Sequence, residues 1–182
     1  MKIKPITVKD KKGCDIELRS AEISDAEILI EYLKNTSKET PYLIQEPEEI
    51  TFTIEEEQNF LKSKIESKKE LMLLAFYGKN FIGSCSLMSM GAHKRYAHRC
   101  SFAIALYQEY CGRGIGKIML KTLLKTAKEI GYEQAELEVM SKNEKAKALY
   151  ESLGFKVYGT LPNNIKYKNG SYDDSFWMMK QL

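Results

Sequence analysis

The chain has 182 residues, of which 43% are hydrophobic and 29% are charged, a composition typical of one globular domain. Its net charge of +3 is small and no dense Lys/Arg stripe with interleaved aromatic residues occurs, so nucleic-acid binding is not expected. No apolar run approaches the roughly 20 residues of a membrane-spanning helix, and the N-terminal residues lack the apolar segment of a signal peptide. We therefore expect a single cytoplasmic domain over residues 1–182 with no membrane contact.

The cysteines and histidines do not suggest a metal centre. The four cysteines show no CxxC spacing, and a cytosolic protein keeps such thiols reduced. His93 and His98 are five residues apart in a segment expected to be a strand or hairpin, where alternation would place them on opposite faces. No metal is expected as a cofactor.

The N-terminal part of the chain is predicted to contain a strand and a helix. Residues 1–13 are predicted to be a polar lead-in, and residues 16–21 are predicted to be the first strand. Ser24 and Glu27 have the spacing of a capping box, which predicts the start of a helix.

A loop and a second helix are predicted next. Residues 35–51 contain two prolines and no apolar period, which predicts a loop. Its apolar tip, residues 42–44, is a candidate wall of a substrate site. Thr53 and Glu56 repeat the capping-box spacing and predict the start of the second helix.

The rest of the chain alternates between strands and helices, with hairpins in the middle and at the end. The expected strands are 71–77, 81–90, 100–106, 132–140, 155–161 and 172–182, and the expected helices are 114–130 and 144–153. Hairpins give antiparallel pairs, and the two helix-linked crossovers are expected to give a parallel part. The predicted fold class is α/β with a mixed, mostly antiparallel, twisted sheet of about six to seven strands flanked by about four helices.

The turn between the strand at 100–106 and the helix at 114–130 is rich in glycine. Gly112, Gly114 and Gly116 permit positive φ and a close approach of a ligand to the backbone, and free N–H groups at the helix start point one way. Arg113 and Lys117 add positive charge. The pattern predicts a phosphate or pyrophosphate site, although it lacks the spacings of a P-loop and of GxGxxG; a plain strand-to-helix turn is the alternative.

Two motifs carry a resemblance to a known family. Residues 111–116, CGRGIG, resemble the acetyl-CoA pyrophosphate signature [QR]xxGx[GA] of the GCN5-related N-acetyltransferase (GNAT) superfamily, and residues 143–155, NEKAKALYESLGF, resemble its NxxAxxLYxxxGF signature. The order of elements is similar too, and the resemblance covers residues 16–182. It implies an N-acetyltransferase that moves an acetyl group from acetyl-CoA to a primary amine of a small molecule or a peptide, by direct attack in a ternary complex.

The resemblance also implies which residues bind acetyl-CoA. The backbone of the strand would pair with the pantetheine arm, and N–H groups of the turn would hold the pyrophosphate. Asn143 would contact the pantetheine arm, beside its plain role as a helix N-cap. The cofactor-binding residues expected are Ile104, Ala105, Leu106, Cys111, Gly112, Arg113, Gly114, Ile115, Gly116, Lys117, Asn143 and Tyr150.

Cys111 stands where the family usually has Gln or Arg. The backbone N–H at this position does not depend on the side chain, so pyrophosphate binding should be retained. Arg113 nearby can lower the pKa of this thiol and make it reactive, but a neutral substitution is the simpler interpretation.

The chemistry needs a base and an acid, because an amine with a pKa of about 10 is mostly protonated at neutral pH and the departing thiolate needs a proton. The resemblance makes Tyr150 the candidate acid; packing on the sheet is the alternative role. Strand alternation puts Glu136 and Glu138 on one face of the sheet. Either this face opens into a cleft, or the two carboxylates are paired. We predict Glu138 as the base, directly or through water. The resemblance supports this choice, because Glu138 lies near the position where a family subset that acetylates peptide N-termini carries its carboxylate. Glu136 is expected to be solvated or salt-bridged, and His98 is a reserve candidate.

The acceptor amine is not identified by the sequence. Residues 172–174, Tyr-Asp-Asp, are candidates to face a cationic amine, and a C-terminal edge strand is a possible homodimer contact. A non-catalytic acyl-CoA-binding or sensing module is the alternative function. An unrelated nucleotide-binding domain is a third.

Overall fold

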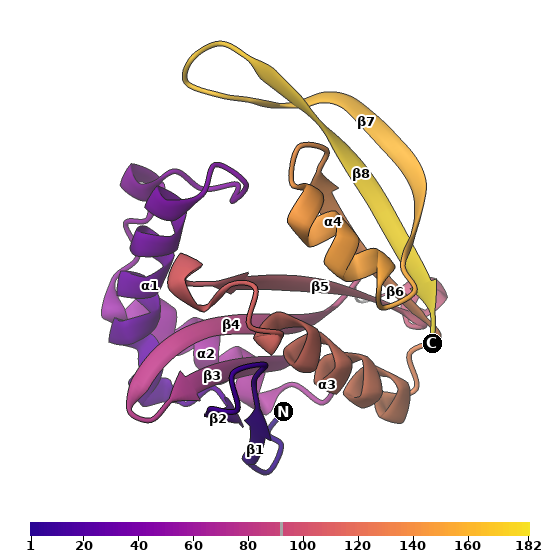
Figure 1. The fold of residues 1–182 in the computed structure, drawn as a ribbon. Helices are drawn as coiled ribbons and strands as arrows, with labels where there is room; N and C mark the ends of the chain where they lie inside the picture. The colour runs from indigo at the N-terminus through magenta and orange to yellow at the C-terminus, as the bar shows by residue number, and fades with distance from the viewer. Residues whose placement is uncertain (92) are drawn as a thin grey trace.

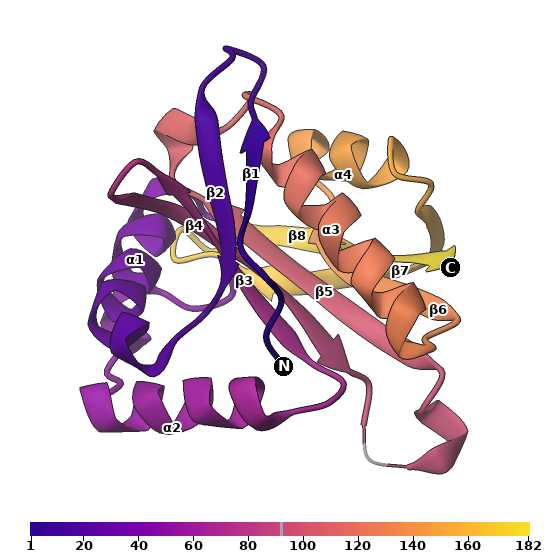
Figure 2. The same cartoon turned by 90° about the horizontal axis from the view of Figure 1, so that it is seen from below.

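A mixed sheet with two α-helices on each face forms the protein in the computed structural model, which describes residues 1–91 and 93–182 (Figures 1 and 2). The strands are β1 (Ile6–Lys9), β2 (Asp15–Ser20), β3 (Leu71–Tyr77), β4 (Asn80–Ser89), β5 (Arg99–Leu106), β6 (Gln134–Met140), β7 (Lys156–Lys166) and β8 (Tyr172–Gln181). The α-helices are α1 (Ala26–Glu39), α2 (Ile54–Glu66), α3 (Ile115–Ile130) and α4 (Glu144–Glu151). Short 3₁₀ turns lie at Ile23–Asp25, Pro47–Glu49, Lys94–Tyr96 and Gln108–Tyr110.

The eight strands lie in the order β1-β2-β3-β4-β5-β6-β8-β7, and β5–β6 is the parallel pair among them. The predicted mixed, mostly antiparallel fold with four helices is therefore confirmed, with more strands than the six to seven expected. The second crossover gives no parallel pair, because β8 lies between β6 and β7 and pairs with both in antiparallel fashion. The edge strand near the C-terminus is thus β7, the last but one strand in sequence.

The additional strand comes from the segment predicted to be a polar lead-in. β1 pairs with β2 through register partners that include Ile6 with Leu18 and Val8 with Ile16. Val8 also packs against the main hydrophobic core. Four lysines in the first eleven residues obscure this short apolar alternation in the sequence, so the lead-in prediction is wrong for residues 6–9.

The helix starts show how local hydrogen bonds set the boundaries. At α2 the predicted capping box is present: the Glu56 N–H donates to Thr53 Oγ1 at 3.2 Å, and the Thr53 N–H donates to Glu56 Oε2 at 2.8 Å. Before α1 the box is formed by Glu22 and Asp25 instead of Ser24 and Glu27. Asp25 also binds Arg19, and this ion pair fixes the earlier turn.

Two further boundaries and the placement of the histidines differ from expectation. α1 continues to Glu39, into the segment predicted to be a loop, and β7 continues to Lys166. His93 and His98 flank the 3₁₀ turn Lys94–Tyr96 and lie on no strand, so their predicted placement on two faces of a strand is wrong. None of the helices in the described part of the chain is long and apolar enough to cross a membrane.

Hydrophobic cores lie on both faces of the sheet. On one face α3 and α4 pack against the strands through residues such as Leu120 and Tyr150. On the other face α1 and α2 contribute Leu29, Tyr32 and Leu61. The two helix pairs lie on opposite sides of the strands in Figure 2.

The sheet opens between its two central parallel strands. The β5–β6 register consists of Arg99 with Gln134, Cys100 with Ala135, and Ser101 with Glu136. Beyond these pairs β5 continues to Leu106 and β6 continues to Met140 without pairing to each other. Residues 103–106 are consequently exposed or half-buried although they lie in the middle of the sheet.

Candidate active site

The glycine turn presents a row of backbone donors. Gly112 and Gly114 adopt left-handed φ values of 76° and 84°, which only glycine takes without strain. The six N–H groups from Gly112 to Lys117 make no hydrogen bond within the described residues. A helix start leaves up to four such donors free, and the left-handed turn adds the others. This row, with the positive end of the α3 dipole behind it, fits an anionic group such as a pyrophosphate.

The β1–β2 hairpin holds this turn in place. The guanidinium of Arg113 lies 2.6 Å from the Asp10 carboxylate, and the Lys11 N–H donates to the Arg113 carbonyl at 2.9 Å. Burial by itself would raise the pKa of Asp10, but hydrogen bonds from the Cys14 N–H and from Arg113 outweigh it and lower that pKa. The side chain of Arg113 is therefore bound to Asp10, and Arg113 can bind a ligand through its backbone N–H.

The unpaired edge of β5 leads directly to the glycine turn. A Cβ placed on Gly116 would lie 3.4 Å from Ile104 and 3.6 Å from both Leu106 and Leu149. The start of α3 thus packs against the end of β5 and against α4. A ligand with an anionic group on the turn can lay an extended arm along β5, in the opening where pairing with β6 has stopped.

Tyr150 lies on α4 and is buried. Its ring centre is 6.0 Å from that of Phe155, and burial raises the pKa of Tyr150 to about 12. Its hydroxyl makes no hydrogen bond within the described residues. In those residues every fully buried polar side-chain atom has a hydrogen-bond partner, so this hydroxyl is not fully buried. The hydroxyl must therefore reach accessible space, where it is protonated at neutral pH and can donate a proton.

The side chain of Asn143 caps a helix, and the thiol of Cys111 is not activated. The Asn143 Oδ1 accepts a hydrogen bond from the Ala146 N–H at 3.2 Å and caps α4, as predicted. Burial raises the pKa of the Cys111 thiol, with a further contribution from Glu39. The expectation that Arg113 lowers this pKa is wrong, because its guanidinium points to Asp10.

The two carboxylates of β6 are both hydrogen-bonded. Glu136 binds Arg99 at 2.5 and 2.7 Å, and this bond lowers its pKa, so Glu136 is the salt-bridged residue of the pair. Glu138 accepts a hydrogen bond from Asn164 Nδ2 at 2.5 Å. By strand alternation Glu138 faces the α1/α2 side of the sheet, but it lines neither of the cavities described below. His98 is exposed at the start of β5, away from the glycine turn.

An apolar cavity of about 390 Å³ lies on the α1/α2 face. Its floor is formed by β4 and β5, and its walls are formed by α1, α2 and the loop between them. The floor includes Ser84, Ser86, Ala103, Ile104 and Ala105, and the walls include Leu29, Tyr32, Leu33, Leu43, Phe52, Glu57 and Phe60. The cavity therefore reaches the open stretch of β5 from the side opposite α3 and α4.

Two cavity residues were not identified from the sequence. The Tyr32 hydroxyl donates to the Ala105 carbonyl at 2.6 Å and accepts from the Ser84 N–H at 3.4 Å, so it bridges β4 and β5. Glu57 lines the cavity from α2. One sequence feature points to it: Glu57 lies one helical turn before the fully buried Leu61, on the inward stripe of the helix.

Other candidate substrate residues have mixed placements. In the α1–α2 loop Leu43 lines the cavity, whereas Ile44 is exposed and Tyr42 donates to the Lys142 carbonyl at 3.1 Å. The Asp173 carboxylate accepts hydrogen bonds from Ser141 and Tyr167 and does not line either cavity. Asp173 thus has a structural role in linking β8 to the end of β6.

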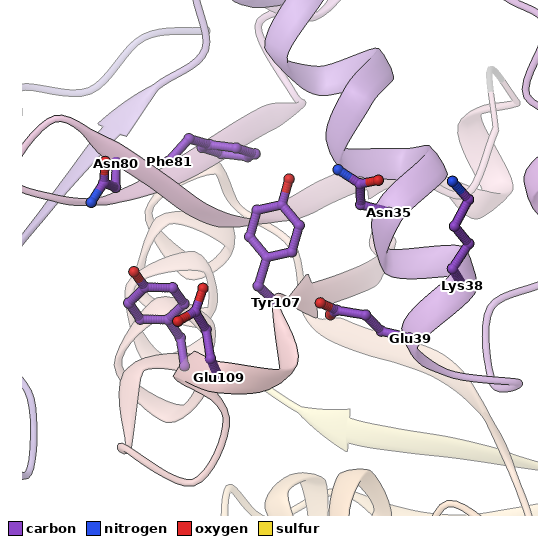
Figure 3. Close-up of a pocket in the computed structure, with 8 residues that line it drawn as sticks. Asn35, Lys38, Glu39, Asn80, Phe81, Tyr107 and Glu109 are labelled. Atoms are coloured by element: carbon purple, nitrogen blue, oxygen red, sulfur yellow. The ribbon is translucent and has the colours of Figure 1, made fainter.

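A second, open cavity of about 470 Å³ lies beside the C-terminal end of α1 (Figure 3). Figure 3 shows Asn35 and Glu39 projecting from α1 toward Tyr107, whereas Lys38 points away from it. Glu39 is already engaged, because its carboxylate accepts the Gln108 N–H at 2.8 Å. The apolar cavity, which reaches the free stretch of β5, is the better candidate for an acceptor site.

Comparison with known proteins identifies the family. Residues 31–155 match the model of the acetyltransferase (GNAT) family. A GNAT-family acetyltransferase from Streptococcus pneumoniae superposes with a TM-score of 0.87 at 27% identity, covering 92% of this chain and 99% of that one. The yncA protein of Salmonella typhimurium, solved with its cofactor acetyl-CoA, superposes with a TM-score of 0.80 at 18% identity, covering 92% and 94%.

A curated relative matches over a shorter segment. The uncharacterized N-acetyltransferase YdgE of Bacillus subtilis (strain 168) is 35% identical over 56 residues, which are 31% of this chain and 36% of that protein. The matched family model covers more than half of the chain, including both the glycine turn and Tyr150. The chain therefore belongs to the GNAT acetyltransferase family.

Proposed function

We propose that this protein transfers the acetyl group of acetyl-CoA to a primary amine. The observation that carries the proposal is the row of six N–H groups from Gly112 to Lys117, which have no partner in the described part of the chain and lie at the end of an unpaired strand edge. A pyrophosphate joined to an extended amide-containing arm, as in coenzyme A, is complementary to both features at once. When bound, acetyl-CoA supplies the activated thioester, and the protein supplies donors, a proton and a place for the amine.

Each protein group has a defined task in this proposal. The N–H groups of the turn bind the pyrophosphate, and the β5 backbone at Ile104–Leu106 aligns the arm. The apolar cavity on the α1/α2 face holds the amine against the same stretch of β5. A nitrogen–carbon bond forms as the carbon–sulfur bond breaks, and Tyr150 gives its proton to the departing sulfur.

The proton lost by the amine needs an acceptor. Glu138 faces the α1/α2 side and keeps one carboxylate oxygen free of the bond to Asn164. We assign it the role of base through an intervening water, because it does not line the cavity itself. This proton would leave to solvent along the β6 side of the opening.

A sensing module that binds acyl-CoA without turnover is the second candidate. The side chain expected at the first position of the signature is absent, since Cys111 stands there. Tyr150 favours the enzyme, because a binding module needs no proton donor.

The test is an acetyl-CoA titration by calorimetry, followed by measurement of free-thiol release with a pooled panel of amines, amino acids and short peptides. Binding together with amine-dependent thiol release is the expected result. Binding without release across the panel would support the sensing module. Preferential binding of ATP or a dinucleotide over coenzyme A would contradict both functions.

A further inference from the structure

Glu57 is a buried carboxylate that no other described residue pairs with. The residue is 6% exposed, and its carboxylate forms neither a hydrogen bond nor an ion pair within the described residues. In those residues every fully buried polar side-chain atom has a hydrogen-bond partner. The unpartnered Glu57 oxygens are therefore not fully buried and reach accessible space. Glu57 lines the apolar cavity, and we infer that its carboxylate faces that space.

A carboxylate in this position is unfavourable for the fold alone. Burial raises the pKa of Glu57, and it is the cause identified for that shift, with no neighbouring cation compensating it. An apolar residue there would continue the inward stripe of α2 beside Leu61. Burial of a charge that lacks a partner costs free energy. A ligand that places a positive charge beside Glu57 would offset this cost.

The surroundings define the charge of that ligand. Among the described residues, no Lys, Arg or His lines the cavity. The other acidic residue in its lining, Glu56, is already engaged by the Thr53 N–H at the start of α2. The titratable groups facing the cavity are thus Glu56, Glu57 and the Tyr32 hydroxyl, which itself bridges β4 and β5.

We propose that Glu57 binds the ammonium group of the acceptor, and that the acceptor is a primary amine with an apolar body and no carboxylate. This inference rests on the proposed acetyltransferase function and specifies its substrate class. The apolar walls at Leu29, Leu43 and Phe60 receive the body of the amine. An amino acid would bring its carboxylate into a cavity with an uncompensated negative charge and without a cationic side chain, and it is therefore rejected.

The test uses matched pairs of probes that differ by one carboxylate. These are 2-phenylethylamine with L-phenylalanine, and pentylamine with L-norleucine. Binding of each probe to the protein saturated with coenzyme A is measured by calorimetry, and turnover with acetyl-CoA is measured separately. The variants are Glu57→Gln, which keeps the shape of the side chain, and Glu55→Gln, an exposed control on the same helix that does not line the cavity.

We expect both amines to bind at least tenfold more tightly than their carboxylated partners. Glu57→Gln should weaken amine binding about tenfold and reduce this preference, with coenzyme A affinity unchanged, whereas Glu55→Gln should behave as the unmodified protein. Equal binding of the paired probes, or equal behaviour of the two variants, overturns the assignment of Glu57 while leaving the acetyltransferase function intact. Failure to bind coenzyme A at all would instead contradict the proposed function.

Discussion

Burial has opposite chemical consequences at Tyr150 and Glu57. Both side chains are more than nine-tenths buried, and burial raises the pKa of each. For Tyr150 the raised pKa keeps the hydroxyl protonated over the whole neutral range, which suits a proton donor. For Glu57 it penalises the charged form, because no described cationic side chain lines the cavity beside it.

Replacing Tyr150 with Phe removes the hydroxyl and keeps the ring packed near Phe155. Loss of a general acid is expected to lower kcat about a hundredfold, while the acetyl-CoA dissociation constant changes little, because the turn and the β5 edge are intact. Steady-state kinetics with calorimetry measures both quantities. Tyr96→Phe, at an exposed position of the 3₁₀ turn Lys94–Tyr96, is the control; unchanged turnover in Tyr150→Phe would remove Tyr150 from the mechanism.

Replacing Glu57 with Gln should stabilise the protein at neutral pH. The folded-state pKa of Glu57 is raised above its ordinary value of 4.5. Its contribution to stability is therefore fully present below about pH 4.5 and is lost as the pH rises through the folded-state pKa. The Gln variant does not suffer this loss, so its free energy of unfolding should exceed that of the unmodified protein by about 1 kcal/mol near neutral pH.

Urea denaturation in acid and near neutrality measures this difference. The two proteins should converge below pH 4.5, where Glu57 is protonated in both the folded and unfolded states. A Gln variant that is less stable at neutral pH would mean that the Glu57 carboxylate has a stabilising partner.

Sequence patterns predicted the residues of the site unevenly. The glycine turn and Tyr150 were singled out because they lie in two motifs that resemble GNAT signatures, and their roles stay predictions. Glu57 was missed because capping boxes and apolar spacing describe α2 as a surface helix with an acidic first turn. The wrong pKa direction for Cys111 has a similar cause: Arg113 is two residues away in sequence but points to Asp10, which is 103 residues distant.

The β1–β2 hairpin and the glycine turn act as one structural unit. Asp10→Asn leaves the buried guanidinium of Arg113 without its counter-charge, and we expect a lower melting temperature together with weaker acetyl-CoA binding. Thermal unfolding and calorimetry test both effects. Asp15→Asn is the matched control, because its pair with Lys9 is about two-thirds exposed on each side and such surface pairs contribute about 1 kcal/mol or less.

One outcome would contradict the coupling of the β1–β2 hairpin to the glycine turn. If Asp10→Asn binds acetyl-CoA as tightly as Asp15→Asn does, the hairpin stabilises the fold without shaping the turn.

Strands β4 and β5 approach closely at Gly83. A Cβ at this position would lie 2.6 Å from the Ala105 carbonyl oxygen and would also overlap the Leu106 side chain. Gly83→Ala should therefore destabilise the protein by about 2 kcal/mol, measured by urea denaturation. Gly159→Ala in the edge strand β7, where an added Cβ meets nothing within 4 Å, should stay close to the unmodified protein. Equal stability of the two variants would show that β4 and β5 can separate at no cost.

The elements were easier to predict where the pattern is long. The buried run of β3 and the amphipathic pattern of α3 gave ranges that agree with the structure to within a residue. β1 has only four residues, and its pairing with β2 depends on the hairpin and the core, which the local sequence does not encode. The sheet order also depends on distant contacts, since β8 inserts beside β6 instead of forming the edge.

Across the whole molecule, segments far apart in sequence meet around the opening between β5 and β6. The arched β7–β8 hairpin in Figure 1 reaches toward the α1–α2 segment, and Lys168 at its tip contacts Glu46 and Glu48 at 3.2 and 2.6 Å. From the other side, the β1–β2 hairpin supports the glycine turn. The site is thus assembled from nearly the full length of the chain.

Coenzyme A should stabilise these regions selectively. Hydrogen exchange should slow most at the amides of residues 112–117, which have no hydrogen-bond partner among the described residues, and at the β5 amides that face β6. Residues 10–14 should be protected through their contact with Arg113, whereas the tip of the β7–β8 hairpin should not change. Mass spectrometry of exchange with and without coenzyme A measures this pattern, and uniform protection of the whole chain would contradict it.

The early end of the β5–β6 register has a consequence for the protein before any ligand arrives. A strand with unpaired N–H and C=O groups is a template for another extended chain, and here that template lies in the middle of the sheet instead of at its rim. The pantetheine arm carries two amide groups and resembles a short peptide strand. Acetyl-CoA bound as proposed would therefore protect this edge as well as supply the acetyl group: while it is bound, the opening would be closed to peptide segments that otherwise add to β5 and start self-association.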